Sequence, residues 1–156
     1  MLLMNIVEQL NSHKYIYLDR LFEVNDLELC ILVDEAKVQE DETLSEGIFS
    51  SCAPIATDET CKKYRIIFRD YVAYSVRNES FTIWDDEEEF TGNLFRVFSR
   101  SKFLDYVAAS TVNVEDTVGM YRHFEIACLN QIIDVASSRE PQVEEIGWQA
   151  ISGGAT

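Results

Sequence analysis

From Tyr64 to Val76 the sequence alternates with a period of two, and this alternation constrains the fold more than any other feature of the chain. Successive side chains of a β-strand point to opposite faces of the sheet, so a period of two predicts an extended segment with one buried face. We therefore expect a long strand, packed on the core through the following residues: Tyr64, Ile66, Phe68, Val72, Tyr74 and Val76. Its opposite face mixes arginine, tyrosine and serine, a half-polar surface that can line a groove.

Other periodic segments complete a pattern of strands with a few helices. Helical spacing of apolar residues predicts a short helix within residues 2–10 and a second helix over 101–110, with Ser99 or Ser101 as its N-cap. Extended runs predict further strands at these places: 15–18, 27–33, 81–84, 94–98 and 121–135. In the last of these runs the side chains of both faces are apolar, so we expect a central strand that is covered on both faces.

The length and composition predict one globular domain. A chain of 156 residues with only two prolines and six glycines is long enough to bury a core of its own. Residues 39–61 lack periodicity and predict a long loop, and Pro141 is expected to end regular structure. We expect a single α+β domain over residues 1–156, built on a mainly antiparallel sheet of about five or six strands with two or three helices.

The charge of the chain limits its partners. Asp and Glu number 28 against 13 Lys and Arg, which gives a formal net charge of −15 at pH 7. Such a surface repels phosphate backbones and anionic lipids, so we expect neither nucleic acid nor membrane as a partner. Residues 62–102 hold eight of the bases and seven of the acids, whereas the segments before and after are strongly acidic. The favoured partner is a basic protein.

Two acidic runs are the candidate contacts for such a partner. Complementary charge raises the rate of encounter and suppresses wrong partners. The residues that we expect to bind the partner are Glu40, Asp41, Glu42, Asp85, Asp86, Glu87, Glu88 and Glu89. The alternative is that these runs are solvated connections that only maintain solubility.

The arginine-rich centre predicts the opposite chemistry. Guanidinium groups that converge with tyrosine form a site suited to a carboxylate or a phosphate, and a histidine beside them could act as an acid or base. The residues of this alternative pocket are Arg65, Arg69, Tyr71, Arg77 and His123, with Arg96 and Arg100 alongside if their strand is a neighbour. The competing interpretation pairs these arginines with acids of adjoining strands and treats His123 as a satisfied structural residue.

Known catalytic and metal-binding motifs do not occur in the sequence. The chain has no GxSxG, GxGxxG, GxxxxGK[ST], HExxH or DxDxDG pattern. Cys30, Cys52, Cys61 and Cys128 lack metal-ligand spacing, so we expect no metal, no cofactor and no assigned catalytic residue. Cys30 and Cys128 lie in apolar runs and are expected in the core, whereas Cys52 and Cys61 are expected to be exposed thiols. The N-terminus lacks the features of a secretory signal or membrane span, which favours a cytoplasmic location.

Four segments carry a resemblance to other proteins: 64–68, 72–80, 103–107 and 128–135. They resemble a group of small bacterial α+β proteins of uncharacterised activity, so no activity follows from the likeness. In size, acidity and α+β pattern the chain is also similar to immunity proteins, which neutralise toxins by direct binding. That likeness implies an inhibitory role.

These observations favour a noncatalytic binding protein, an inhibitor or immunity-type factor, whose acidic surface engages a basic protein. The alternative is a small-molecule-binding protein or enzyme that uses the arginine and tyrosine pocket, with His123 as acid or base. A third hypothesis is a mimic of nucleic acid, in which carboxylates take the places of phosphates. Exposed strand edges would also allow a homo-oligomer.

Overall fold

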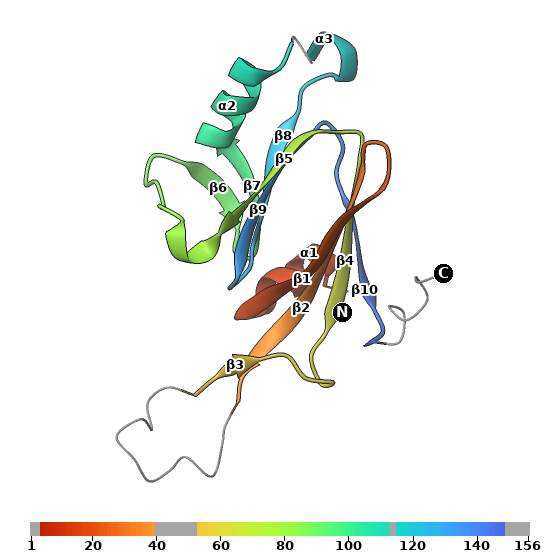
Figure 1. The fold of residues 1–156 in the computed structure, drawn as a ribbon, viewed down its shortest axis with the longest axis vertical. Coiled ribbons are helices and arrows are strands. Elements are labelled where there is room, and N and C mark those ends of the chain that lie inside the picture. Colours follow the sequence, from red (N-terminus) through yellow and green to blue (C-terminus); the bar gives the residue numbers. More distant parts are fainter. Residues whose placement is uncertain (1–3, 40–52, 113–114, 149–156) are drawn as a thin grey trace.

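The computed structural model describes residues 4–39, 53–112 and 115–148, which form an α+β fold of two antiparallel sheets (Figure 1). The first sheet has the strand order β1 (Tyr15–Asn25), β2 (Glu28–Val38), β4 (Lys63–Arg69), β10 (Gln142–Ile146), with the short β3 (Ile55–Ala56) paired to the end of β2. The second sheet has the order β5 (Tyr71–Asn78), β9 (Gln131–Ser137), β8 (Arg122–Ala127), β7 (Phe95–Arg100), β6 (Glu89–Gly92). The expected α+β class with antiparallel pairing is confirmed, with the strands shared between two five-stranded sheets.

The hydrophobic core lies between the two sheets. Alternate residues of the central strands point inward, as the period-two pattern requires. The rings of Phe68 in the first sheet and Phe124 in the second lie 5.5 Å apart and join the two layers. Both sheets and α1 supply the fully buried residues of this core: Leu10, Ile16, Leu29, Ile31, Val33, Tyr64, Ile66, Phe68, Phe124, Ile126, Ile133 and Val135.

The expectation of one long strand from Tyr64 to Val76 is wrong, because the chain passes from one sheet to the other at Asp70. Asp70 has φ +58°, in the left-handed region, and a register shift follows between Tyr71 and Ala73. A left-handed residue turns the strand direction, so β4 and β5 belong to different sheets. β9 and β10 make the same passage beside them (Figure 1). Arg139 Nη1 lies 2.9 Å from Asp70 Oδ2 at this point. We call this double crossing the Asp70 corner.

The expectation of a single central strand over residues 121–135 is also wrong. The segment forms a hairpin of β8 and β9, with residues 128–130 between them. Asn130 explains the turn, because its side chain binds the backbone of β1: the Leu18 amide donates to Asn130 Oδ1 at 2.9 Å, and Asn130 Nδ2 donates to the Leu18 carbonyl at 3.1 Å. A turn in the second sheet is thereby fixed to the first.

Both expected helices are confirmed. Asn5 begins α1 (Ile6–Ser12) with a capping box that includes Glu8, and Ser101 caps α2 (Lys102–Ser110) by accepting a hydrogen bond from the Leu104 amide. In Figure 1 α2 lies over the end of the second sheet, where it contacts β8 and β9. A further short helix, α3 (Glu115–Val118), precedes β8. None of the helices in the described part of the chain has the length and apolarity needed to cross a bilayer.

Three smaller expectations need correction. The expected strand over residues 81–84 is absent from the described structure; the 3-10 turn η2 (Glu79–Phe81) and an irregular segment stand there. Regular structure does not end at Pro141, because β10 follows and pairs with β4. Cys61 is buried rather than exposed, whereas burial of Cys30 and Cys128 is confirmed. Part of the expected loop over 39–61 lies outside the described residues, as do Cys52, Glu40, Asp41 and Glu42.

The packing between the sheets gives a direct test. Phe124 is fully buried against Phe68 and Phe95, so Phe124→Ala should lower the free energy of unfolding by about 3–5 kcal/mol, the usual cost of such a cavity. Phe81→Ala removes the same atoms from a side chain that is 84% exposed, and should change it by less than about 0.5 kcal/mol. Urea denaturation measures both, and equal losses would contradict the two-sheet core.

Candidate functional site

A row of polar side chains crosses the outer face of the second sheet. Ser75 of β5, Asp134 of β9, Glu125 of β8 and Arg96 of β7 are direct partners in the strand register. Because side chains alternate along a strand, the neighbours of these residues point into the core while the row itself faces away from it. Four strands thus bring together groups that lie up to 59 positions apart in the sequence.

The buried carboxylates of this row are paired with bases. Asp134 Oδ1 lies 2.8 Å from His123 Nε2, and Asp134 Oδ2 lies 3.0 Å from Arg77 Nη2. Glu125 Oε1 lies 2.9 Å from Arg96 Nη1, while Glu125 Oε2 is 3.6 Å from Arg77 Nη2. His123, Glu125 and Asp134 are each only 2% exposed. Buried charges need partners of this kind, so the row is held in one geometry.

Ser101, His123 and Asp134 form a hydrogen-bonded chain. His123 Nδ1 lies 2.8 Å from Ser101 Oγ, and its Nε2 faces the Asp134 carboxylate, which can only accept. The imidazole therefore carries its proton on Nε2 when neutral and accepts at Nδ1 from the serine hydroxyl. Ser101 Oγ also accepts a hydrogen bond from the Leu104 amide, as the N-cap of α2. This serine caps α2 and holds it against the sheet through His123.

The two buried carboxyl groups have pKa values shifted in opposite directions. Burial, and then the charge of Asp134, raise the pKa of Glu125 from its ordinary 4.5 to about 7, with Arg96 and Arg77 opposing the shift. Burial would also raise the pKa of Asp134, but the hydrogen bond from His123 and the charges of His123 and Arg77 outweigh it and lower the pKa. Of the two carboxyl groups, Glu125 is therefore the one that holds a proton at the higher pH.

A cavity of about 440 Å³ opens above this row, and we call it the row cavity. Glu125, Asp134 and His123 form its floor, and its other polar lining residues are Ser75, Arg77, Thr82, Asp85, Glu88 and Lys102. Phe81, Ile83 and Phe103 supply apolar walls. Its size and its mixture of apolar walls with a few convergent polar groups are typical of ligand sites. A larger cavity of about 680 Å³ lies at the Asp70 corner, but its two charged lining residues, Asp70 and Arg139, pair with each other.

The expected arginine and tyrosine pocket is only partly assembled. Arg77 and His123 line the row cavity, but Arg65 and Arg69 belong to the first sheet. Arg65 binds Glu144 there with Nη2 at 2.5 Å, and Arg69 Nε lies 3.6 Å from Glu28. The Tyr71 hydroxyl donates a hydrogen bond to the Glu23 carboxylate. The Asp70 corner causes this separation, because it sends the two halves of the expected strand to different sheets.

Basic side chains are neutralised throughout the fold. In the described residues every Lys and Arg side chain other than Lys14 has a nitrogen within 4.0 Å of an Asp or Glu oxygen. The expectation that the central arginines pair with acids of adjoining strands is thus confirmed for Arg65, Arg77 and Arg96. The excess charge of the chain therefore remains on acids.

The acidic run Asp85–Glu89 lies at the mouth of the row cavity and has two kinds of member. Asp85 pairs with the Lys102 ammonium, Glu88 Oε1 accepts from the Lys102 amide at 2.9 Å, and Glu89 contacts Ser99. These three hold the run against α2 and β7. Asp86 and Glu87 are exposed, with Glu87 4.0 Å from Arg100. The part of the run that is free to meet a partner is therefore Asp86 and Glu87.

The polar row does not fit a metal centre well. One atom each from His123, Glu125 and Asp134 lies within 4.8 Å of the others, which is close enough to surround an ion. However, Arg77 and Arg96 already bind the carboxylates at 3.0 and 2.9 Å, and a metal would have to displace these guanidinium groups. The donor set is thus arranged for ion pairs, and we assign no metal to it.

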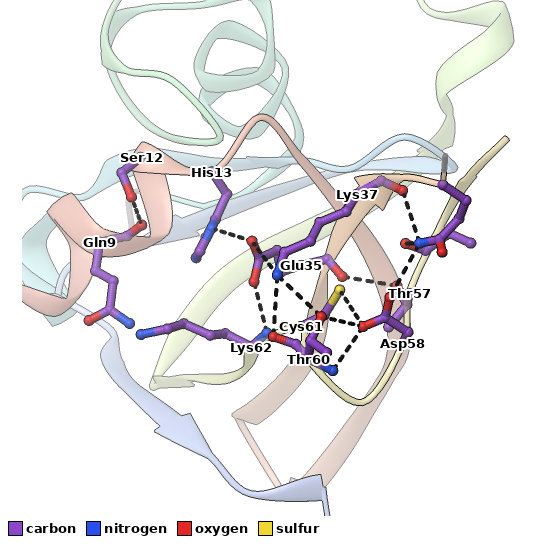
Figure 2. Close-up of polar contacts among 12 residues, drawn as sticks. Gln9, Ser12, His13, Glu35, Lys37, Thr57, Asp58, Thr60, Cys61 and Lys62 are labelled. Atoms are coloured by element: carbon purple, nitrogen blue, oxygen red, sulfur yellow. Dashed lines mark hydrogen bonds and ion pairs between the residues drawn. The ribbon is translucent and has the colours of Figure 1, made fainter. Parts of the chain in front are cut away.

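His13 belongs to a second polar cluster, at the end of the first sheet (Figure 2). Its Nδ1 lies 3.1 Å from Glu35 Oε1, and its Nε2 lies 2.5 Å from the Tyr64 hydroxyl. Glu35 Oε2 also accepts from the Lys62 amide at 2.9 Å. These contacts join α1, β2 and the start of β4, and we interpret the cluster as structural.

Comparisons with models of protein families, with curated proteins and with solved structures each found no match to this chain. The site is therefore interpreted from its own chemistry.

Sequence reasoning missed Glu125, Asp134 and Ser101 as members of the site. Each carboxylate interrupts a run of apolar residues, Phe124 to Leu129 and Ile132 to Val135, and this interruption was the available signal. An acid in such a run must find a base once it is buried. The register that supplies Arg77 and Arg96 could not be derived from spacing.

The raised pKa of Glu125 predicts a pH dependence of stability. The folded protein binds this proton more tightly than the unfolded chain, so ionisation between about pH 4.5 and 7 favours unfolding. The free energy of unfolding of the wild type should therefore fall across that range relative to Glu125→Gln, and the difference should level off above it. Denaturant titrations at a series of pH values measure this.

Asp85→Asn is the control. The hydrogen bond from Lys102 lowers the pKa of Asp85, so its contribution is lost only as the pH falls below the ordinary value of 3.8. If the wild type and Glu125→Gln kept a constant difference from pH 4.5 to 7, the buried carboxyl pair would not be as we describe it.

Proposed function

We propose that this protein is a noncatalytic binding protein that engages a basic protein partner. The contact surface is the segment of residues 79–89, which follows β5 and forms one side of the row cavity. An inhibitor or immunity-type factor is the form of this function that we favour, because such proteins act by direct binding. We place it in the cytoplasm, a proposal supported by the free thiols of Cys30, Cys61 and Cys128.

One observation carries the proposal. Phe81 is 84% exposed and Ile83 is 88% exposed, and the exposed acids Asp86 and Glu87 follow them in the same segment of the chain. Large apolar side chains that remain exposed and adjacent, with charged residues at their rim, are characteristic of protein interaction sites. Trp84, which is also exposed, follows Ile83 in the chain. The acidic rim selects a basic partner, and the net charge of −15 adds a long-range attraction.

The apolar and acidic parts of this surface should act on different steps of binding. Rim charges mainly set the rate of encounter, whereas desolvated apolar anchors mainly set the lifetime of the complex. Phe81→Ser with Ile83→Ser should therefore abolish stable capture of a basic protein from the native cell extract. Asp86→Asn with Glu87→Gln should slow association with the captured protein roughly threefold to tenfold at low salt, with little effect at high salt.

The control removes equal charge elsewhere. Asp26→Asn with Glu59→Gln neutralises two exposed acids outside the segment and should leave both capture and on-rate within about twofold of the wild type. Biosensor kinetics at two salt concentrations provide the rates. The proposal is wrong if the apolar pair can be removed without loss of capture, or if both charge variants slow association equally.

A second candidate is favoured by the row cavity itself: a small-molecule-binding protein or enzyme, with His123 or its neighbour Glu125 as acid or base. The supporting observation is the pair of carboxyl groups with divergent pKa values on the floor of a cavity. The sequence predicted that several arginine side chains of this site bind the carboxylate or phosphate of a small molecule. Of those arginines, only Arg77 lines the cavity.

This second candidate predicts that small anions stabilise the fold. Phosphate, citrate or glutamate at ~10 mM should raise the thermal midpoint by a few degrees, and Arg77→Gln should remove the effect. Arg20→Gln, which changes an exposed arginine of β1, is the control. A midpoint that does not respond to anions, or a response that survives Arg77→Gln, would count against an anion site.

A further inference from the structure

We propose that the row cavity receives a basic side chain of the partner, an arginine or a lysine, with Glu125 as its counter-ion. This inference rests on the proposed function and names the feature of the partner that the site would recognise. It requires three features: acidic side chains at the floor of the cavity, a carboxylate oxygen that can accept a further hydrogen bond, and apolar walls that pack against the methylene groups of the entering side chain.

The charges in the row cavity are sorted by depth. Two basic side chains line the cavity, and both are well exposed: the side chain of Lys102 is 77% exposed and that of Arg77 is 45% exposed. The acids lie deeper, with Asp85 at 18% and both Glu125 and Asp134 at 2%. A side chain entering from outside therefore passes Lys102 at the mouth and meets, at the floor, the carboxylates that Arg77 also contacts.

Glu125 has one oxygen that is loosely held by bases. Its Oε1 is bound by Arg96 at 2.9 Å, but its Oε2 lies 3.6 Å from Arg77 Nη2, which is longer than a hydrogen bond. Asp134 has close partners on both oxygens. Glu125 also shares a hydrogen bond with the Asp134 carboxyl, so Oε2 can accept from a guanidinium or an ammonium once the proton of Glu125 has left. A metal ion, by contrast, needs several ligands at once.

The walls suit the stem of such a side chain. Phe81, Ile83 and Phe103 line the cavity, and lysine and arginine bury their methylene groups against apolar surface while their charged ends bind acids. Phe81 and Ile83 are also the exposed anchors of the proposed contact surface. A partner that covers this segment would thus bring its own side chain to the mouth of the cavity.

Binding should be coupled to the loss of a proton. The charged and titratable groups around Glu125 come from every neighbouring element: His123 on β8, Asp134 on β9, Arg77 on β5, Arg96 on β7, Lys102 on α2, and Asp85 and Glu88 on the segment before β6. A basic side chain at Oε2 favours the ionised form of Glu125 and lowers its pKa from about 7. Near neutral pH, binding should therefore release a proton from those molecules in which Glu125 was protonated.

Two capped tripeptides, Ala-Arg-Ala and its citrulline counterpart, provide the test. Citrulline keeps the shape of arginine without the charge. Carbon-13 NMR of the Glu125 carboxyl should show a lower titration midpoint with the arginine peptide and no change with the citrulline peptide. Calorimetry in buffers of different ionisation enthalpy should detect the proton release, and Glu125→Gln should abolish it and weaken binding about tenfold.

Asp86→Asn separates this inference from the proposed function, because Asp86 is an exposed acid that is absent from the cavity lining. Proton release that persists in Asp86→Asn supports insertion into the cavity. If the arginine peptide shifts resonances of residues 85–89 but leaves the Glu125 midpoint unchanged, the inference fails and the acidic contact surface stands. A peptide that perturbs neither region also overturns the inference. The proposed function is tested separately, by whether the variant with Phe81→Ser and Ile83→Ser still captures a basic protein.

Discussion

The Asp70 corner is the constraint on which the rest of the structure depends. One residue in the left-handed region, Asp70, turns the chain from β4 into β5, and its ion pair with Arg139 joins it to the neighbouring passage from β9 to β10. The two sheets can face each other across a shared core only because the chain turns there. The same turn separates Arg65 and Arg69 from Arg77, so it decides which bases reach the candidate site.

Burial of the polar row follows from that arrangement. Once β5, β9, β8 and β7 lie side by side, their outer face presents two carboxylates that α2 and the segment of residues 79–89 help to cover. Desolvation of two adjacent acids is expensive unless bases accompany them. Arg77 and Arg96 bind the two carboxylates from opposite sides. Their charges do not fully offset the burial of Glu125 and the charge of Asp134, so the pKa of Glu125 stays raised. Stability and any chemistry of the site are thus linked through one carboxyl group.

Fewer acidic side chains are free in the folded protein than the sequence indicates. Nearly all the bases of the described chain are matched with acids, so the arginine-rich centre does not stand out as a positive surface. The run Asp85–Glu89 is divided between members that fasten α2 and members that face solvent. A charge run read from sequence therefore overstates the number of carboxylates that remain free for a partner.

The sequence by itself determined the class of the fold, the capped helix after Ser101, the inward face of Tyr64, Ile66 and Phe68, and the excess of acid, because these depend on local periodicity, local capping and composition. Only the tertiary structure decided that Tyr64–Val76 is two strands, that Glu125 and Asp134 share a floor with His123, and that Phe81 and Ile83 stay exposed beside them. A single left-handed residue leaves the alternation of side chains intact, and cross-strand register is set by packing between distant segments. Local patterns therefore reveal which face of a strand is buried, but not which residues of other strands it will meet.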